Sequence, residues 1–476
     1  MTVDETLLRE RLARITKARD WPPELLIEFE RFVREATDAG LFRVNPRRWA
    51  ADRAQPERAA IDLFLYAAWA GLFHIDWSLL CPACGDEVES FRTLKNVSLH
   101  FRCTLCRTTN ETNLDDFIHV SFTVAPLVRR IAFHDPLTLS AEDFYFKYRF
   151  HAEARRPDGK TFVQLIQELQ VGLDYVEPGA TRRFELDLAP GWLVITDAPN
   201  NALVVVALVG EPTTERRVLR YSFDRDTTVS ETPQVAPGPL TIEITNAASE
   251  RSPVLIFWEP EGMDVPVLDF GPVLTGKQVL STQTFRTLFN NETVQGAEGL
   301  SVKDITILFT DLKGSTAMYD RIGDLKAFAI VQQHFDSLRR VIDAHQGAIV
   351  KTIGDAIMAT FLQPRDAVRA GIAMLEEIES FNRTIGRDDI MLKVGIHRGA
   401  SIAVTLNERL DYFGQTVNIA ARVQGLADAR EIYITEEVSA APGVGELLGS
   451  CAVEAQLTQV KGVREQLKVF RIAPRA

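Results

Sequence analysis

The spacing of apolar residues divides the chain into a helical beginning, a strand-rich middle and a mixed C-terminal part. Near the N-terminus, five apolar residues recur every three or four positions, which is the spacing of one helix face: Leu25, Leu26, Phe29, Phe32 and Val33. From about residue 118 to 262, short apolar runs such as FIHVSFTV, FVQLIQELQV and NALVVVALVG alternate with turn clusters such as PDG and APNN. This rhythm predicts the short strands of a β-sandwich.

After Val302 the pattern changes again, and strands alternate with long helices. The run ITILFTD predicts a strand, followed by a helix over 315–345, a hairpin in AIVKTIGDAIMATF and a second helix over 365–381. The strand IMLKVGIHRG, a helix over 416–426 and the final strands REIYI and KVFRI complete the pattern. Alternation of this kind predicts an α/β layer with helices covering one sheet.

Composition and charge narrow the class of protein. The chain has 476 residues, which at about 150 per domain predicts two to four domains. Its 53 basic and 65 acidic residues give a net charge of -12, which disfavours general binding to nucleic acid. The longest apolar runs, at 63–73 and 202–209, are shorter than the about 18 residues of a membrane-spanning helix. We therefore expect a cytoplasmic protein with no membrane and no nucleic-acid partner.

Four of the five cysteines form two CxxC pairs, Cys81 with Cys84 and Cys103 with Cys106. Four thiolates at this spacing are a typical ligand set for Zn²⁺, and four protein ligands leave no open position for chemistry. The alternatives are buried reduced thiols or a redox pair. Because acidic and basic residues are nearly balanced in this segment, we expect a structural zinc ribbon that does not bind nucleic acid. Cys451 is predicted to be a buried free thiol.

Together these patterns predict a multidomain chain of five segments. They are a helical region over 1–80 that allows a winged-helix arrangement, a zinc ribbon over 81–117, a β-sandwich-like regulatory domain over 118–265, a connector over 266–300 and an α/β domain over 301–476. The run GPVLTGKQ, within the connector, nearly matches a phosphate-binding loop. It has Gln278 where a Ser or Thr hydroxyl would bind Mg²⁺, so a turn into a connector helix is favoured.

The motif FTDLKGST points to phosphate and metal chemistry at the end of a strand. The strand ends at Asp311, and the chain passes through Gly314 to Ser315 and Thr316 at a helix start. Backbone N–H groups at such a terminus can hold a polyphosphate, and a carboxylate can provide an oxygen ligand for Mg²⁺. A strand, an aspartate and a loop before a helix are common, so this motif alone has low specificity.

Two further motifs carry charged residues in matching positions. In KTIGDAIMATF, Asp355 lies at a turn and Lys351 lies four residues earlier in an otherwise apolar strand. In LDYFGQTVNIAARV, Asn418 and Arg422 are i and i+4 and therefore share one helix face. Arg is well suited to stabilising charge on a phosphoryl group during transfer. Each residue alone would be read as a turn or a solvated helix face, but their joint occurrence favours phosphoryl chemistry.

Residues from about 302 to 474 resemble the catalytic domain of class III nucleotidyl cyclases, the adenylate and guanylate cyclases. The motifs FTDLKGST, KTIGDAIMATF, KVGIHRG and LDYFGQTVNIAARV carry the resemblance, in this order. The N-terminal two-thirds resembles, less sharply, an uncharacterised zinc-ribbon-containing module found ahead of such domains in bacterial proteins. The resemblance implies a ferredoxin-like α/β fold that acts as a head-to-tail homodimer with active sites shared between the two chains.

The resemblance also implies a role for each motif residue. Asp311 and Asp355 match the two metal aspartates of the family, which would hold two Mg²⁺ or Mn²⁺ ions per active site. Asn418 and Arg422 match the catalytic residues that position the ribose and stabilise the transition state at the α-phosphate. Lys393, in LKVGIHRG, matches a basic contact to phosphate.

The choice of base follows from hydrogen-bond chemistry. Lysine can only donate and an ionised aspartate can only accept, which suits the N1 acceptor and 6-amino donor of adenine. Lys351 and Asp411 match the adenine-specifying pair of the family, whereas guanine-specific members tend to carry Glu and a small residue. A second basic phosphate contact is either Lys461 or Arg464, because the alignment is ambiguous there.

We therefore expect an adenylate cyclase that converts ATP to 3′,5′-cyclic AMP and pyrophosphate and is regulated by its N-terminal region. Its expected metals are Mg²⁺ or Mn²⁺ at the active site and a structural Zn²⁺. Guanylate cyclase is the second interpretation. A silent nucleotide-binding scaffold would predict loss of Asp311 or Asp355, and a zinc-ribbon transcription factor would predict a basic face; the sequence has neither feature.

Overall fold

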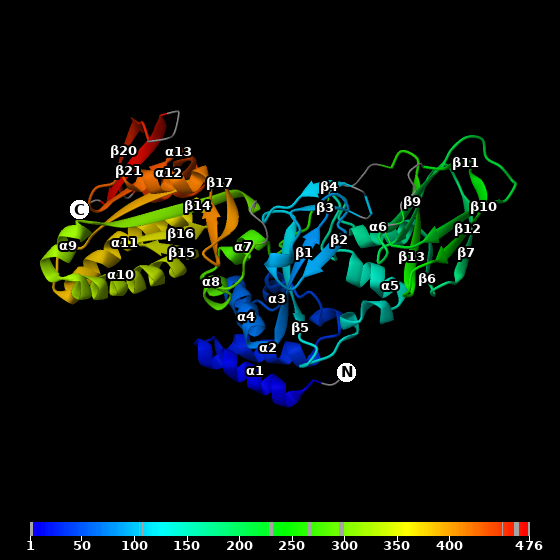
Figure 1. Ribbon diagram of the computed structural model, residues 1–476, viewed down its shortest axis with the longest axis horizontal. Helices are drawn as coiled ribbons and strands as arrows, with labels where there is room; N and C mark the ends of the chain where they lie inside the picture. Colours follow the sequence, from blue (N-terminus) through cyan, green and yellow to red (C-terminus); the bar gives the residue numbers. More distant parts are fainter. Residues whose placement is uncertain are drawn as a thin grey trace. The chain divides into compact units, whose positions relative to one another are not determined.

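The computed structural model consists of two compact units (Figure 1). It describes residues 3–103, 105–106, 108–225, 227, 232–263, 268–294, 299–449, 451–460 and 466–474. Unit 1 comprises Met1–Arg92, His100–Thr112 and Asp116–Leu274, and unit 2 comprises Thr93–Leu99, Asn113–Asp115 and Thr275–Ala476. The connector predicted over 266–300 is therefore divided, and its helices belong to unit 2.

Unit 1 begins with helices packed beside a three-stranded sheet. The helices are α1 (Glu5–Ala18), α2 (Pro23–Glu35), α3 (Pro46–Asp52) and α4 (Glu57–Ala70), and the strands β1 (Phe73–Leu80), β2 (Glu87–Phe91) and β5 (Ile118–Val124) pair antiparallel in the order β2-β1-β5. Leu25, Phe29, Phe32 and Val33 are buried, as their spacing predicts. Residues 73–80, at the end of the segment expected to be helical, form the strand β1 instead. This strand pairs with β2 on one side and with β5 on the other.

A helical stretch separates this sheet from the strands that follow. It contains η3 (Ala132–His134), η4 (Pro136–Thr138), α5 (Ala141–Asp143), the π-helical η5 (Phe144–Arg149) and α6 (Phe162–Leu169). The expected strand FVQLIQELQV was wrong, since most of it forms α6. Phe162, Leu165 and Ile166 have helical spacing and are buried, and Thr161 caps the helix in a capping box with Gln164.

Two sheets with one buried core make up the rest of unit 1. The first has the order β10-β12-β7 and the second β11-β9-β8-β13-β6. Their strands are β6 (Gln170–Val176), β7 (Thr181–Leu188), β8 (Gly191–Asp197), β9 (Ala202–Leu208), β10 (Arg217–Phe223), β11 (Gln234–Val235), β12 (Gly238–Asn246) and β13 (Ser252–Pro260). Alternate residues from both sheets, such as Ile195 and Ile242, fill the core between them. This two-sheet region begins at Gln170, not at residue 118, because β5 pairs with β1 instead.

The long segment of unit 2 begins with the two connector helices, α7 (Gly276–Leu280) and α8 (Gln283–Leu288). Gln278, the residue that breaks the phosphate-binding pattern, accepts a hydrogen bond from the Thr275 N–H while its own N–H donates to the Thr275 hydroxyl. This is a capping box. The turn into a connector helix is confirmed, and the box explains glutamine at this position.

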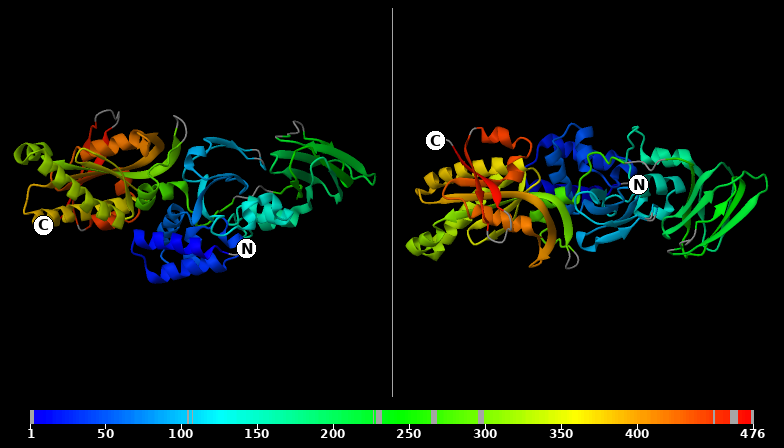
Figure 2. Two further views of the ribbon diagram at one scale, coloured as in Figure 1. Left: turned by 60° about the horizontal axis from the view of Figure 1, so that its bottom comes forward. Right: turned by 90° about the horizontal axis from the view of Figure 1, so that it is seen from above.

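The rest of unit 2 is a mixed sheet covered by helices on both faces (Figure 2). The strands run in the order β15-β16-β14-β17-β19-β21-β20, with β18 also paired to β17. They are β14 (Leu300–Lys313), β15 (Gly347–Ile353), β16 (Ala356–Phe361), β17 (Met391–Leu406), β18 (Arg409–Phe413), β19 (Glu431–Thr435), β20 (Cys451–Thr458) and β21 (Leu467–Pro474). The α/β layer predicted after residue 301 is confirmed.

The helices of unit 2 pack on this sheet in two groups. They are α9 (Ser315–Ile322), α10 (Asp324–Ala344), α11 (Pro364–Ile385), α12 (Gln415–Gln424), α13 (Glu436–Ser439) and α14 (Val444–Leu448). Helices α10 and α11 share the larger core with one face, whereas α12 packs on the other face through Ile419 and Val423. The single helix predicted over 315–345 is two helices, because Gly323 has a φ of +81° and ends α9.

Candidate functional site

Lys351 and Asp411, which lie 60 residues apart in the sequence, form an ion pair in unit 2. The Lys351 ammonium lies 2.5 Å from Asp411 Oδ2, and the Asp411 side chain is 9% exposed. The other Asp411 oxygen accepts a hydrogen bond of 2.7 Å from the Tyr412 N–H. One donor and one acceptor of opposite charge are thus held together at one place.

Local irregularities of the sheet bring the two side chains together. The register between β15 and β16 shifts between Ile349 and Lys351, a type of irregularity that redirects the side chains beside it. Strand β18 returns along β17 through a tight turn at Asn407 and Glu408, both with positive φ. That turn places Asp411 opposite Val404 in the β17–β18 ladder.

A second ion pair lies on neighbouring strands of the same sheet. Asp311 near the end of β14 pairs in register with Lys393 on β17, and their side chains approach to 2.5 Å. Both side chains are partly buried. The predicted phosphate contact and one predicted metal aspartate are therefore adjacent in the structure.

Asp355 occupies the two-residue turn between β15 and β16, after Gly354 with its φ of +62°. Its Oδ2 atom is buried and has no hydrogen-bond partner among the described residues. The antiparallel register of β14 with β16, extended by two residues, brings Asp311 opposite Ala356, next to this turn. A buried carboxylate oxygen without a partner fits a hard divalent cation.

The remaining predicted residues lie at the beginning of α9 and along α12. Gly314 has a φ of +77° and precedes α9, whose first turn contains Ser315 and Thr316. Asn418 is exposed and Arg422 half-buried on α12, and neither side chain has a hydrogen-bond or ion-pair partner within the part of the chain that the structure describes. The candidate phosphate contacts Lys461 and Arg464 lie outside the described residues.

Helix α12 is held very close to the sheet by a glycine. A Cβ added at Gly395 on β17 would lie 2.1 Å from the backbone nitrogen of Gln424, so only glycine fits there. The Thr416 hydroxyl also donates a hydrogen bond to the carbonyl of Ala400. These contacts fix the helix that presents Asn418 and Arg422.

Two residues of α8 that the sequence analysis did not single out contact the strands of the Lys351–Asp411 pair. Gln283 accepts a hydrogen bond of 2.9 Å from the Ile349 N–H on β15. Arg286 donates to the carbonyl of Leu410 on β18 at 3.2 Å, and its guanidinium lies 5.3 Å from the centre of the Tyr412 ring. No sequence motif marks them, since these contacts join residues more than 60 positions apart.

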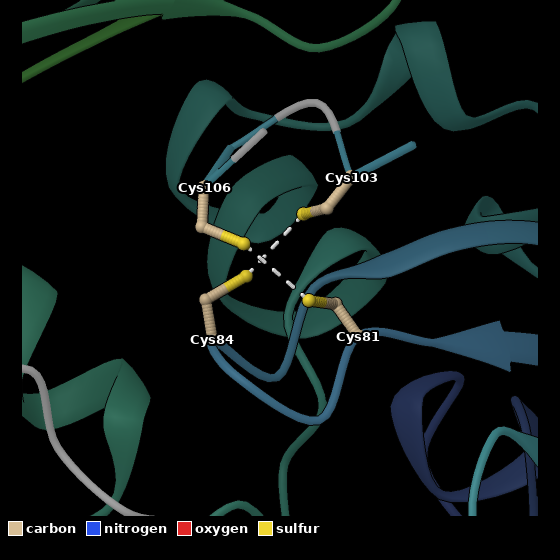
Figure 3. A group of neighbouring side chains, drawn as sticks. All are labelled: Cys81, Cys84, Cys103 and Cys106. Atoms are coloured by element: carbon tan, nitrogen blue, oxygen red, sulfur yellow. Dashed lines mark hydrogen bonds between the residues drawn. The ribbon is translucent and has the colours of Figure 1, made fainter. Parts of the chain in front are cut away.

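The four motif cysteines of unit 1 form one compact cluster (Figure 3). Their sulfur atoms all lie within 4.8 Å of one another, with 3.5 Å between Cys81 and Cys106 and 3.4 Å between Cys84 and Cys103. A tetrahedral zinc with Zn–S bonds of about 2.3 Å needs sulfur atoms about 3.8 Å apart. The cluster can therefore hold one zinc ion. Hydrogen bonds among the four thiols lower the pKa of Cys106 and Cys81 and raise the pKa of Cys84 and Cys103.

A buried ion pair lies beside the cysteine cluster. The Asp86 carboxylate lies 3.6 Å from Cys103 Sγ and 2.7 Å from the guanidinium of Arg149 on η5. Both Asp86 and the side chain of Arg149 are largely buried. The Arg149 charge offsets a carboxylate that would otherwise disfavour a neighbouring thiolate.

Two family models match successive parts of the chain. Residues 10–287 match a family of unknown function, DUF5939, and residues 299–473 match the adenylate and guanylate cyclase catalytic domain. The chain belongs to the DUF5939 family, and residues 299–473 are a class III adenylate/guanylate cyclase catalytic domain. Both resemblances expected from the sequence are thereby confirmed. Class III cyclases use divalent metal ions in catalysis, which agrees with the unpaired oxygen of Asp355.

The chain is similar to named cyclases over part of its length. It is 30% identical over 198 residues to an adenylate cyclase of Anabaena cylindrica, covering 37% of this chain and 39% of that protein. It is 30% identical over 138 residues to adenylate cyclase 1 of Rhizobium meliloti strain 1021, covering 26% and 21%. The solved adenylyl cyclase CyaB of P. aeruginosa is 18% identical, with a TM-score of 0.33, over 37% of this chain and 97% of that one. The chain thus spans about two fifths or less of these curated relatives. Within the described residues, no helix is both long and apolar enough to cross a membrane.

We predict that the purified full-length protein contains one zinc ion per chain, measured by elemental analysis after purification without chelator. Cys81→Ser should lose the zinc and lower the melting temperature, because three thiolates cannot complete the tetrahedral site. Cys451→Ser is the matched control and should keep the zinc, since Cys451 lies on β20, outside the cluster. A metal-free wild-type protein, or a Cys81→Ser variant with an unchanged melting curve, would contradict the prediction.

Proposed function

We propose that this chain is an adenylate cyclase, which converts ATP to 3′,5′-cyclic AMP and pyrophosphate. The observation that carries the proposal is the contact between Lys351 and Asp411. Adenine offers an acceptor at N1 and a donor at its 6-amino group. A lysine and an ionised aspartate side by side offer the complementary pair, whereas guanine would place donor against donor and acceptor against acceptor.

The ribose and phosphates are assigned to residues of the other motifs. Asp311 and Asp355 would hold two Mg²⁺ or Mn²⁺ ions, which when bound favour loss of the proton from the ribose 3′-hydroxyl. Lys393 and the backbone N–H groups after Gly314, at Ser315 and Thr316, would bind the polyphosphate.

Asn418 and Arg422 would act at the ribose and at the α-phosphate. Asn418 would position the ribose, and the guanidinium of Arg422 would stabilise the charge that develops on the α-phosphate during attack by the 3′-oxygen.

The proposed catalytic unit is a homodimer with two shared active sites. Asp311 and Asp355 would come from one chain, while Lys351, Asp411, Asn418 and Arg422 would come from its partner, as the class III resemblance implies. The exposure of Asn418 on α12 supports this arrangement, since it leaves the side chain accessible to a second copy. A two-fold dimer then has two equivalent sites.

Regulation by the N-terminal module would act through α7 and α8. Unit 1 ends at Leu274, and α7 begins two residues later. The contacts of Gln283 with β15 and of Arg286 with β18 support this route. A shift of α8 would move both strands, and these strands carry Lys351 and Asp411. Guanylate cyclase and a silent nucleotide-binding scaffold are the alternatives, and turnover measurements separate all three.

Steady-state turnover with ATP, GTP, CTP and UTP tests the choice of base. Wild-type protein should prefer ATP, and the double variant Lys351→Glu with Asp411→Cys should lower the ATP-to-GTP ratio of kcat/KM at least tenfold. Each mismatched hydrogen bond to a buried base costs about 1–3 kcal/mol. Lys326→Glu, an exposed lysine on α10, is the charge-matched control and should keep the wild-type ratio. Equal production of cyclic GMP and cyclic AMP by the wild type would show that the assignment is wrong.

Mixing inactive variants tests the shared sites. Asp311→Ala and Arg422→Ala should each be nearly inactive alone. In a mixed dimer one site receives both changes and the other receives none. With random exchange half of the dimers are mixed, so about a quarter of wild-type activity should return. Asp311→Ala mixed with Asp355→Ala is the control and should stay inactive, because both changes affect the metal half. No recovery in the first mixture, despite demonstrated heterodimers, would refute the shared-site arrangement.

A further inference from the structure

Unit 1 contains a cavity of about 430 Å³ that the cyclase chemistry does not use. This volume lies in the range of small-molecule binding sites, about 300–1,000 Å³. Aromatic rings from the helices α2, α3 and η5 and from the loops that follow η1 (Ala39–Leu41) and η5 line it: Phe32, Phe42, Trp49, Phe146 and Phe150. Rings that come from five separate places around one space suit a flat apolar body.

Two buried donors in the cavity wall have no acceptor. Trp49 is 2% exposed, and its indole N–H has no hydrogen-bond partner among the described residues. The Nε of Arg43 is also buried without a partner. A buried donor left unpaired costs about 1–3 kcal/mol. Arg43 already lies against the Glu87 carboxylate, so the Trp49 N–H is the donor that a ligand acceptor would satisfy, after a small shift of the indole ring on binding.

Most charges around the cavity are already paired. Arg43 lies 2.5 Å from the buried carboxylate of Glu87, and Arg48 pairs with Glu153. Arg53 is different, since no carboxylate of the described residues lies within ion-pair distance of it. Its guanidinium stacks 4.9 Å and 5.2 Å from the rings of Phe32 and Trp49. The guanidinium also donates to the Trp49 carbonyl at 3.4 Å. The wall therefore holds one positive charge without a carboxylate partner, on the same side of the cavity as Trp49.

The two histidines of the cavity do not form a free metal site. Burial lowers the pKa of His119 to about 3 and that of His151 to about 4, so both are neutral. His151 Nδ1 accepts from the Glu153 N–H, which leaves its Nε2 to donate to His119 Nδ1 at 3.4 Å. The other His119 nitrogen then donates to the backbone of Asp116. All four ring nitrogens are used within the protein.

We propose that this cavity binds a small aromatic carboxylate, with its ring among the phenylalanine side chains and its carboxylate on Arg53 and the Trp49 N–H. The proposal goes beyond the cyclase activity, because it assigns a ligand to the module that precedes the catalytic domain. Neutral aromatic molecules would leave the Arg53 charge unpaired, and small aliphatic acids would leave the aromatic surface unfilled.

The cavity also borders the segment that leads into the connector. Val273 and Leu274, the last residues of unit 1, form part of its wall. Hydrogen bonds of 2.9 Å from Arg47 to the Val273 carbonyl and of 2.7 Å from the Val120 N–H to the Leu274 carbonyl hold this segment. Helix α7 starts at Gly276. A ligand in the cavity would thus contact the chain directly before the connector helices.

Calorimetry and thermal melting of the full-length protein test the site without any measurement of cyclase activity. The probes are benzoate, phenylacetate and indole-3-acetate, each compared with its neutral amide, and acetate as the aliphatic acid. At least one aromatic acid should bind and raise the melting temperature. Its amide should bind at least tenfold more weakly, because removing the charge removes one charge-assisted hydrogen bond.

Two variants locate the binding in this cavity. Arg53→Gln removes the charge at a half-buried position, and Trp49→Phe replaces the indole by a smaller ring that lacks the N–H. Each should weaken binding of the best probe about tenfold, whereas Arg130→Ala, an exposed arginine away from the cavity, should not. If no aromatic acid binds, if acid and amide bind equally, or if Arg53→Gln binds like the wild type, the proposal is overturned. Failure here would leave the ATP turnover of the catalytic domain unaffected, so the two proposals are tested separately.

Discussion

The ion pair between Lys351 and Asp411 is the constraint on which the proposed chemistry depends. Its two members come from strands that are not hydrogen-bonded to each other, so their separation of 2.5 Å must be maintained by other contacts. The register shift in β15 and the tight β17–β18 turn set the course of the two strands. The hydrogen bonds of Gln283 and Arg286 on α8 hold them in place. A partly buried pair of this kind stabilises a fold little, because desolvation offsets the attraction. Its value lies in presenting a donor and an acceptor in fixed positions.

The same sheet holds the metal and phosphate groups at a second place. Asp311 and Lys393 neutralise each other across two strands, and the Asp355 oxygen remains unpaired at a nearby turn. Within one chain, the exposed Asn418 has no partner among the described residues. A single chain thus carries both halves of the proposed site, which is the expected arrangement for a protein that completes its sites by dimerisation.

The sequence was sufficient to predict features that depend on local pattern. The cysteine spacing predicted a compact cluster, and the motif order predicted the α/β catalytic domain and the hairpin that carries Lys351 on a strand and Asp355 at its turn. The strand predicted at 162–171 was wrong, because a short apolar run fits the spacing of a strand and that of a helix equally well. The capping box at Thr161 favours the helix that forms there. The long helix predicted from residue 315 was interrupted by one glycine in a left-handed conformation.

Other features could not be read from the sequence, because they depend on contacts between distant residues. The pairing of β5 with β1 in place of the later strands is one example, and the hydrogen bond from Arg286 to Leu410 is another. Leu410 opens the motif LDYFGQTVNIAARV, but no charge or spacing pattern marks Arg286 as its partner. The cavity of unit 1 likewise combines side chains from segments separated by more than 100 residues, such as Trp49 and Phe150.

We infer that base selection depends on strands held by α8, and the ATP-to-GTP ratio of kcat/KM in Arg286→Gln provides the test. Arg286 does not touch the base in the proposed site, so a change in selectivity would have to come through Leu410 and Tyr412. We expect the ratio to fall several-fold, because a charge-assisted hydrogen bond contributes about 1.5–3 kcal/mol. The exposed Arg340→Gln on α10 is the control. An Arg286→Gln variant with the wild-type ratio would show that base selection does not depend on the contacts of α8.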